Sequence, residues 1–159
     1  MFQQPDSEIP KVISTSYGDD EQTIPISYAT RICQDFGKLG LRGVSILIAS
    51  GDNGVASAGD QCVSNDGKNI PMFVPGFPNS CPYVTAVGAT SGIPERGIAL
   101  SGGGFSNYFP RPKYQETVVN QYIESLGQQY MGFYNSTGRA FPDVAFQGLA
   151  FSVFIHGQE

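Results

Sequence analysis

The stretch 43–54 constrains this chain more than any other. Residues 44–49, Val-Ser-Ile-Leu-Ile-Ala, form an apolar run with little polar alternation. Such a run is typical of a strand that is covered on both faces, as strands of parallel sheets are. The run stops at a Gly-Asp-Asn-Gly turn, 51–54, whose one carboxylate is Asp52. The stretch therefore predicts a buried strand that delivers Asp52 to the end of a sheet.

A second strand and a helix are predicted before this stretch. Residues 11–16 are rich in β-branched side chains and end at the turn 17–20. From Pro25 to Leu39 apolar residues recur at helical spacing, and Gly40 follows the last of them. A strand, a helix and a strand over this length predict a βαβ unit with two parallel strands.

This arrangement would place Gly18 and Asp52 just beyond the carboxyl ends of parallel strands, at one edge of the sheet. In open parallel α/β sheets, ligands bind at that edge, so a carboxylate there favours a functional site. The alternative is that 51–54 is a plain turn, since its residues are ordinary turn formers.

The rest of the chain continues the α/β pattern. Residues 83–90 predict a third strand, 138–145 a turn followed by extended chain, and 151–155 a last strand. An apolar stripe over 114–127 predicts a helix packed in the core, with a groove for a partner as the alternative. We expect one domain, 1–159, of α/β class, with a parallel sheet and helices on both faces. The final strand has no closing helix after it, so the fold is expected to be truncated.

Charge and hydropathy exclude two classes of partner. The net charge of −5 and the sequence pI of about 4.7 leave no basic stripe that could neutralise phosphates, so nucleic acid is not expected as a partner. No run of 18 apolar residues occurs, and residues 1–6 lack the features of a signal peptide. No membrane association is expected; the protein is either cytosolic or lacks its true N-terminus.

The three cysteines allow one disulfide. Cys33 lies on the apolar face of the predicted helix and is expected to be a core residue. Cys62 and Cys81 flank a loop-rich segment, where a bridge would stabilise the fold most, and form the candidate disulfide. The sequence has no Cys-x-x-Cys pair, and His156 is its one histidine, which argues against a zinc site.

Two short motifs have specific interpretations. Asn135-Ser136-Thr137 is a glycosylation sequon and, with a disulfide, favours the secretory pathway. The glycine run 101–104 could indicate a nucleotide-binding domain, but it lacks the GxGxxG spacing and a lysine. A backbone that approaches another segment closely is the preferred explanation.

Five blocks, in order and with compatible spacing, resemble the sedolisin family of serine-carboxyl peptidases, especially the fungal secreted and lysosomal tripeptidyl peptidases. The resemblance covers about residues 8 to 157. The blocks are 14–20 (Ser-Thr-Ser-Tyr-Gly-Asp-Asp), 43–54, 80–88 (Ser-Cys-Pro-Tyr-Val-Thr-Ala-Val-Gly), 101–112 and 138–145.

The resemblance implies a subtilisin-like fold and a peptidase mechanism. Family members use a Ser nucleophile in Ser-Gly-Thr-Ser, a Glu base supported by an Asp on an upstream helix, and an Asp in the oxyanion hole. The family's Ser-Gly-Asp turn matches 50–52, which assigns the oxyanion role to Asp52. Only a protonated carboxyl donates a hydrogen bond, and a free Asp side chain in water has a pKa of about 4. Activity is therefore expected at acid pH. The substrate-binding residues implied are Ser16, Tyr17, Gly18, Ser50, Gly51, Ser101, Gly102 and Gly103.

Three parts of the family pattern do not occur in this sequence: the Ser-Gly-Thr-Ser motif, a Glu/Asp helix before Pro10, and the calcium loop. We therefore expect the parent protein to be an acid-acting peptidase that binds calcium outside this chain, and the chain alone to be inactive. The expected partner is a peptide or unfolded protein. The expected location is secreted, or alternatively a lysosome or vacuole. The competing hypothesis is a noncatalytic relic that binds peptides or a partner protein.

Overall fold

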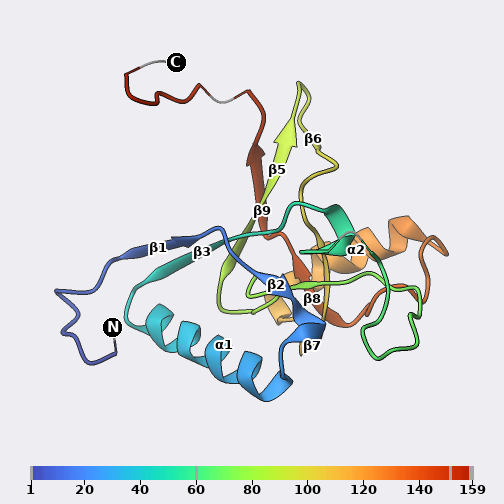
Figure 1. Cartoon of the computed structure of the whole chain (residues 1–159), viewed down its shortest axis with the longest axis horizontal. Coiled ribbons are helices and arrows are strands. Elements are labelled where there is room, and N and C mark those ends of the chain that lie inside the picture. Colours follow the sequence, from blue (N-terminus) through green and yellow to red (C-terminus); the bar gives the residue numbers. More distant parts are fainter. Residues whose placement is uncertain (1, 60, 151, 158–159) are drawn as a thin grey trace.

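The structure, a computed structural model, describes residues 2–59, 61–150 and 152–157 (Figure 1). Its main sheet contains five strands, of which β1, β3, β5 and β9 run parallel and β6 runs antiparallel to β5. β1 pairs with β3, β3 with β5, and both β6 and β9 with β5. The five strands are β1 (Val12–Thr15), β3 (Ser45–Ala49), β5 (Thr85–Ser91), β6 (Arg96–Gly97) and β9 (Val144–Gln147). The three parallel strands predicted from the sequence are therefore present.

Two antiparallel pairs stand beside the main sheet. One joins β2 (Asp19–Asp20) to β4 (Gly76–Phe77), and the other joins β7 (Gly104–Pro110) to β8 (Gly138–Phe141). Within the described residues, three single turns of 3₁₀ helix connect the elements: η1 (Glu21–Thr23), η2 (Gly54–Ala56) and η3 (Lys113–Gln115).

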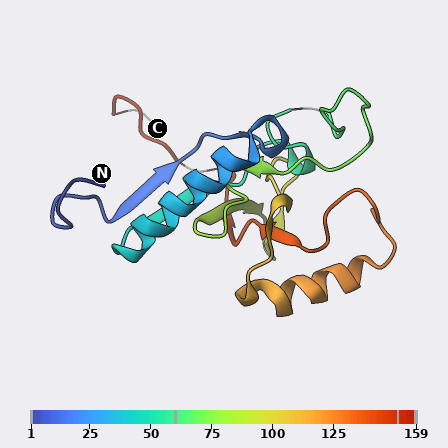
Figure 2. The ribbon, with the colours of Figure 1, turned by 90° about the horizontal axis from the view of Figure 1, so that it is seen from below.

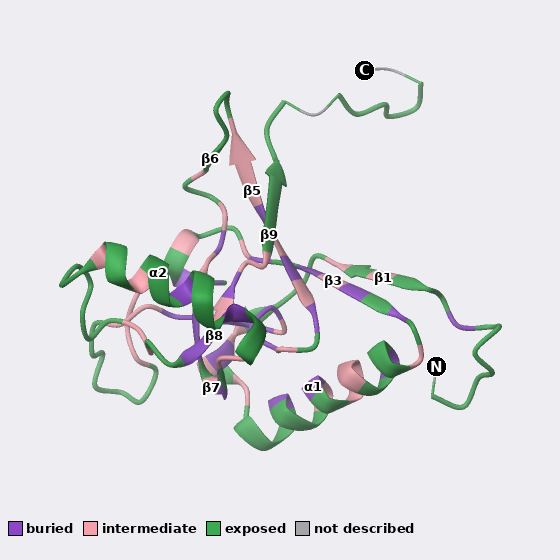
Figure 3. Ribbon diagram, turned by 180° about the vertical axis from the view of Figure 1, so that it is seen from behind, coloured by how far each residue is buried: buried purple, intermediate pink, exposed green. Residues whose placement is uncertain are grey.

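Helix α1 (Ile26–Leu41) covers the β1–β3 part of the sheet and packs against it in the core (Figures 1 and 3). Its apolar stripe is buried as the periodicity predicts, because one face of the helix meets the buried side chains of β3. The core residues are Ile9, Ala29, Cys33, Leu39, Val44, Ile46, Ile48, Phe77, Cys81, Val84 and Phe109.

Helix α2 (Glu116–Leu126) lies on the other side of the strands from α1, as Figure 2 shows. Helices therefore occur on both sides, but the predicted core packing of α2 is wrong. Val119 is its one buried residue, whereas Tyr114, Val118 and Tyr122 are 64%, 69% and 54% exposed. The periodicity identified the helix correctly; the described residues cover only a narrow part of its apolar stripe.

The last strand is β9, which falls within the segment predicted to be a turn and extended chain. The strand predicted at 151–155 is not found: residue 151 lies outside the described residues, and 152–154 have no regular structure. Among the described helices, none is long and apolar enough to cross a membrane.

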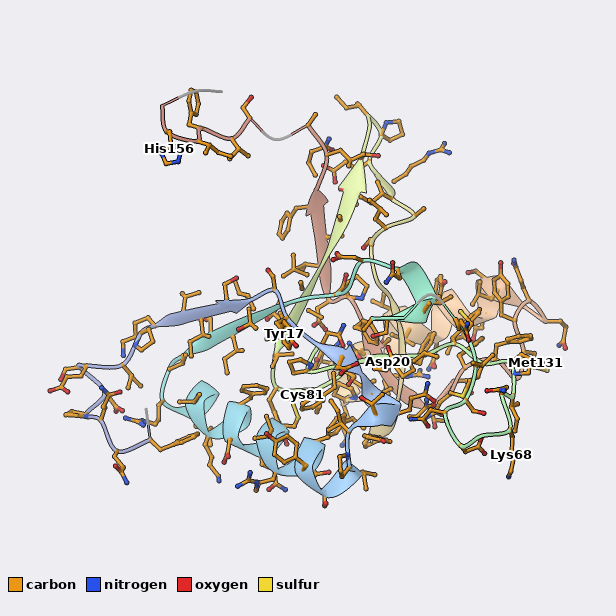
Figure 4. The ribbon with its side chains drawn as sticks, in the orientation of Figure 1. Tyr17, Asp20, Lys68, Cys81, Met131 and His156 are labelled. Atoms are coloured by element: carbon orange, nitrogen blue, oxygen red, sulfur yellow. A yellow bond between two sulfur atoms is a disulfide. The ribbon has the colours of Figure 1, made fainter. Side chains whose placement is uncertain are left out.

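The disulfide joins Cys33 to Cys81, with their Cα atoms 5.6 Å apart, and Cys62 is a free, half-buried cysteine. The predicted pairing of Cys62 with Cys81 is therefore wrong. Cys81 lies in a buried segment beside α1 (Figure 4), and Cys33 lies on the face of the helix that packs against this segment. Loop position suggested the pairing, but the packing of α1 on the core determines it.

Candidate functional site

Asp52 lies in the turn that follows β3, at the same sheet edge as the end of β1. Parallel pairing of the two strands matches Thr15 with Ile48, so the segments after both strands leave the sheet side by side. They line one pocket of about 340 Å³, to which Ser16, Tyr17, Gly18, Gly51 and Asp52 all contribute. Five of the residues proposed from the sequence are thus brought together, and the βαβ pattern explains why.

The residues around Asp52 differ sharply in exposure. Asp52 itself is exposed, and Tyr17 is 84% exposed at the rim (Figure 4). Ser50, in contrast, is 3% exposed and does not line the pocket. Its backbone N–H donates to the carbonyl oxygen of Val87 at 2.9 Å, and its own carbonyl oxygen accepts a hydrogen bond from the Asn79 side chain at 2.7 Å. Hydrogen bonds of both the N–H and the carbonyl oxygen therefore fix the backbone of Ser50, two residues before Asp52.

Gly102 packs directly against this turn. Its N–H donates to the carbonyl oxygen of Gly51 at 2.7 Å, and a Cβ built on Gly102 would lie 2.1 Å from the Ser50 carbonyl oxygen. Gly103 likewise donates to the carbonyl oxygen of Gly54 at 3.1 Å. The glycine run is thus a close approach of two backbones, as predicted from the sequence, and a side chain at Gly102 has no room.

Ser101 and Gly103 line a different, apolar pocket of about 660 Å³. This pocket lies between α2 and the β7–β8 pair, and its aromatic wall includes the rings of Phe105 and Tyr134, whose centroids are 4.8 Å apart. The segment 51–57 therefore has the polar pocket on one side and the apolar pocket on the other. The predicted cleft wall 101–103 borders the second pocket, not the first.

Several pocket residues were not predicted. Asp19, Asn53, Ser57, Gly76 and Asn79 also line the pocket beside Asp52. Asp19 and Asn53 belong to motif blocks that were identified from the sequence, but Ser57, Gly76 and Asn79 come from segments with no motif that points to this site. Nothing in the local sequence marks Asn79, because its partner Ser50 is 29 positions away.

Asp20 and Glu21, which are adjacent in the chain, hold neighbouring segments through hydrogen bonds to their carboxylates. Asp20 accepts the backbone N–H of Ala58 at 2.9 Å and so holds the end of the Asp52 loop (Figure 4). Glu21 is 0% exposed; it accepts the hydroxyl of Ser106 and, at 2.7 Å, the backbone N–H of Asn107. Burial raises the pKa of the Glu21 carboxyl, although these hydrogen bonds act in the opposite direction.

The sequon Asn135 is half-buried and takes part in the fold. Its side-chain N–H donates to the carbonyl oxygen of Ser106 at 2.9 Å, and its side-chain oxygen accepts the Thr137 hydroxyl at 2.8 Å. Glycosylation there stays a prediction.

Within the described residues, no group of three or more His, Cys, Asp or Glu side chains is arranged to hold a metal ion. The calcium that the resemblance implies would bind outside this chain, and no residue of this chain is assigned as its ligand.

Comparison with known proteins agrees with the sequence blocks. Tripeptidyl-peptidase SED2 of Arthroderma otae is 48% identical over 159 residues, which is 99% of this chain and 26% of that protein. Probable tripeptidyl-peptidase SED4 of Arthroderma benhamiae is 52% identical over 161 residues, again 99% of this chain and 26% of the relative. The chain thus spans about a quarter of the length of these relatives. No protein-family model matches it.

The fold has a solved counterpart. Pseudomonas sedolisin, a serine-carboxyl proteinase solved with two molecules of pseudo-iodotyrostatin, superposes with a TM-score of 0.62 and 23% identity, covering 89% of this chain and 39% of the sedolisin chain. The relatives establish kinship along nearly the whole chain, and the superposition establishes the subtilisin-like fold. Along nearly its whole length this chain is therefore similar to about a quarter of the length of these tripeptidyl-peptidases, and it shares its fold with sedolisin.

Proposed function

We propose that this chain supplies the oxyanion-hole Asp and part of the substrate cleft of an acid-acting serine-carboxyl peptidase that releases tripeptides from the N-termini of peptides. The observation that carries the proposal is the position of Asp52 at the common edge of β1 and β3, on the rim of a pocket that the 16–18 segment also lines. The names of the tripeptidyl-peptidase relatives support the reaction class.

The proposed role of Asp52 is to donate a hydrogen bond to the oxygen of the reacting carbonyl as negative charge develops on it. A donor in this role typically lowers the barrier by about 3 to 4 kcal/mol. A carboxyl group donates only when it is protonated, so acidic solution is required for the proposed step. The rigid attachment of Ser50 and Gly51 serves this role, because an oxyanion donor contributes most when it is held in place before the reaction.

The segment 16–18 is proposed to bind the peptide backbone. It connects β1 to β2, and Gly18 and Tyr17 line the pocket beside Asp52. An extended peptide that lies along such a segment gains main-chain hydrogen bonds, while the neighbouring pocket receives a side chain. The proposed substrate is accordingly a peptide or an unfolded protein.

The proposed location is extracellular, with a lysosome or vacuole as the alternative. The Cys33–Cys81 disulfide supports an oxidising compartment, as does the sequon at Asn135. Addition of a glycan during expression in a secreting fungal host, detected as a mass increase that Asn135→Gln removes, would support this location; an unmodified Asn135 would argue against the sequon being used.

The test of function uses a protein in which this chain is joined to sedolisin-family segments that carry the Ser nucleophile and the Glu/Asp pair. We expect Asp52→Ala to lower kcat at least ~10²-fold on a tripeptide substrate with a fluorogenic leaving group. Asp52→Asn should keep a donor that does not titrate and so retain more activity than Asp52→Ala near neutral pH. Asp66→Asn, at an exposed carboxylate of a distant loop, is the matched control.

An undiminished kcat in Asp52→Ala would overturn the oxyanion assignment. The competing proposal is a noncatalytic domain of the same fold that binds peptides in the pocket beside Asp52. Binding of peptides by the chain, together with no cleavage by any joined protein whose other segments are known to be active, would favour that second proposal.

A further inference from the structure

The side chain of Asn79 closes the inner end of the pocket beside Asp52. Asn79 is 5% exposed, and its Nδ2 donates to the carbonyl oxygen of Ser50 at 2.7 Å. Because a carbonyl oxygen can only accept, this bond fixes which end of the amide is nitrogen. The other end, Oδ1, is therefore the acceptor that remains, and among the described residues it has no hydrogen-bond partner.

The position of this amide depends on a glycine across the pocket. A Cβ built on Gly76 would lie 2.9 Å from both terminal atoms of the Asn79 amide and 2.6 Å from Oγ of Ser57. The amide thus occupies the volume that a side chain at Gly76 would otherwise fill. Gly76 and Asn79 together set the shape of the inner wall.

The charges around the pocket all have the same sign. Its lining includes the carboxylates of Asp19 and Asp52, and no Lys, Arg or His contributes to it among the described residues. Asp19 is exposed at the rim, whereas Asn79 is deep. A side chain that enters the pocket therefore meets negative charge first, and the inner wall includes Asn79, whose Oδ1 is buried and unpaired among the described residues.

We propose that Asn79 is a specificity-determining residue that selects substrates with an N–H donor, from Lys, Arg or Gln, on the residue whose carbonyl lies at Asp52. This inference rests on the proposed function and adds the substrate class. A buried acceptor without a partner is costly, and a donor from the substrate removes that cost. An aliphatic side chain of similar length leaves the acceptor unpaired, which is the strongest form of discrimination that a pocket provides.

An amide is suited to this task in acid. Carboxylates lose their charge when they are protonated, and the proposed role of Asp52 requires its protonated form. The amide oxygen of Asn79 does not titrate and accepts hydrogen bonds at any pH at which the chain folds. Selection by Asn79 should therefore persist at low pH.

The test measures binding of three peptide amides to the 159-residue chain: Ala-Ala-Lys, Ala-Ala-Gln and Ala-Ala-norleucine. Chemical-shift changes at the N–H groups of Gly18 and Gly51 report Kd for each. We expect the Lys and Gln peptides to bind about tenfold more tightly than the norleucine peptide, and Asn79→Ala to remove most of the Gln preference. Asn107→Ala, at an exposed asparagine on β7, is the matched control and should keep the preference.

The outcomes separate the two proposals. Binding of none of the three peptides would contradict the peptide cleft and so the proposed function. Equal binding of all three by the wild-type chain would overturn only the role of Asn79. If Asn79→Ala does not fold, the wild type decides alone: a Gln preference that is equal at pH 4 and pH 7 supports the non-titrating amide, and a Gln preference lost at pH 4 assigns it to the carboxylates and overturns the inference.

Discussion

Gly102 lies so close to Ser50 that the two backbones exclude any side chain between them: a Cβ on Gly102 would be 2.1 Å from the Ser50 carbonyl oxygen. Gly102→Ala should therefore force the 101–104 segment away from the Asp52 turn and lower the free energy of unfolding by about 1 to 3 kcal/mol. Urea unfolding measures this change. Gly40→Ala is the control, because nothing lies within 4 Å of its Cβ and alanine favours helix α1. A Gly102→Ala chain as stable as wild type would contradict this prediction, because it would show that the two backbones can move apart without a loss of stability.

Arg139 forms a buried ion pair with Asp143, with Nη2 and Oδ2 2.5 Å apart and Arg139 0% exposed. Asp143 also accepts the backbone N–H of Ala86 at 2.7 Å, so the pair fastens the β8–β9 connection to β5. Arg139→Met leaves the partly buried carboxylate of Asp143 without its cation, which should lower the free energy of unfolding by about 3 kcal/mol.

Thermal or urea unfolding measures the effect of Arg139→Met. The matched control is Lys38→Met, which removes the cation of the surface pair with Asp35 and should change the stability by less than about 1 kcal/mol. Equal effects of the two substitutions would contradict the importance of the buried pair.

Glu21 makes the stability of the chain depend on pH in a direction opposite to that of an ordinary paired carboxylate. Its pKa is raised in the folded chain, chiefly by burial, above the reference value of 4.5. The folded chain then holds this proton more tightly than the unfolded chain, so the contribution of Glu21 to stability is fully present in acid. It declines as the pH rises through the raised pKa.

The test compares urea unfolding of the wild type and of Glu21→Gln between pH 4 and 7. We expect the wild-type stability, relative to that of the variant, to decrease as the pH rises. The change with pH is the readout, since glutamine also alters the hydrogen bonds to Ser106 and Asn107 at every pH. Glu124→Gln, at an exposed position of α2, is the control. A relative stability that increases with pH would contradict this account.

The Cys33–Cys81 disulfide closes a loop across 48 positions of sequence. Replacing both residues by alanine frees the unfolded chain and should lower the free energy of unfolding by about 4 kcal/mol. Cys62→Ala removes the free cysteine and is the matched control. Mapping the disulfide by mass spectrometry of non-reduced peptides checks the pairing directly, and a Cys62–Cys81 peptide would refute it.

Local pattern was enough to predict the elements that depend on one stretch of sequence. β3 and α1 follow from an apolar run and a helical periodicity, and the meeting of Gly18 with Asp52 follows from their parallel strands. Contacts between distant segments were out of reach. Asn79 contacts Ser50 across 29 positions and Glu21 contacts Ser106 across 85, and neither residue carries a local signature of its partner.

The prediction that the apolar stripe of α2 packs in the core was wrong for a related reason. Periodicity shows that one side of a helix is apolar, but what lies against that side is a property of the assembled chain. Tyr122 and Val118 therefore belong to a correctly predicted helix and to an incorrectly predicted core.

Cys81 follows Asn79 by two residues, so the disulfide to α1 is fastened almost at the inner wall of the pocket. The disulfide thus attaches the inner wall of the pocket covalently to helix α1. Asn79 is therefore held from two directions, by its own hydrogen bond to Ser50 and by the disulfide two residues later, so loss of the disulfide would free the inner wall of the pocket as well as destabilise the fold.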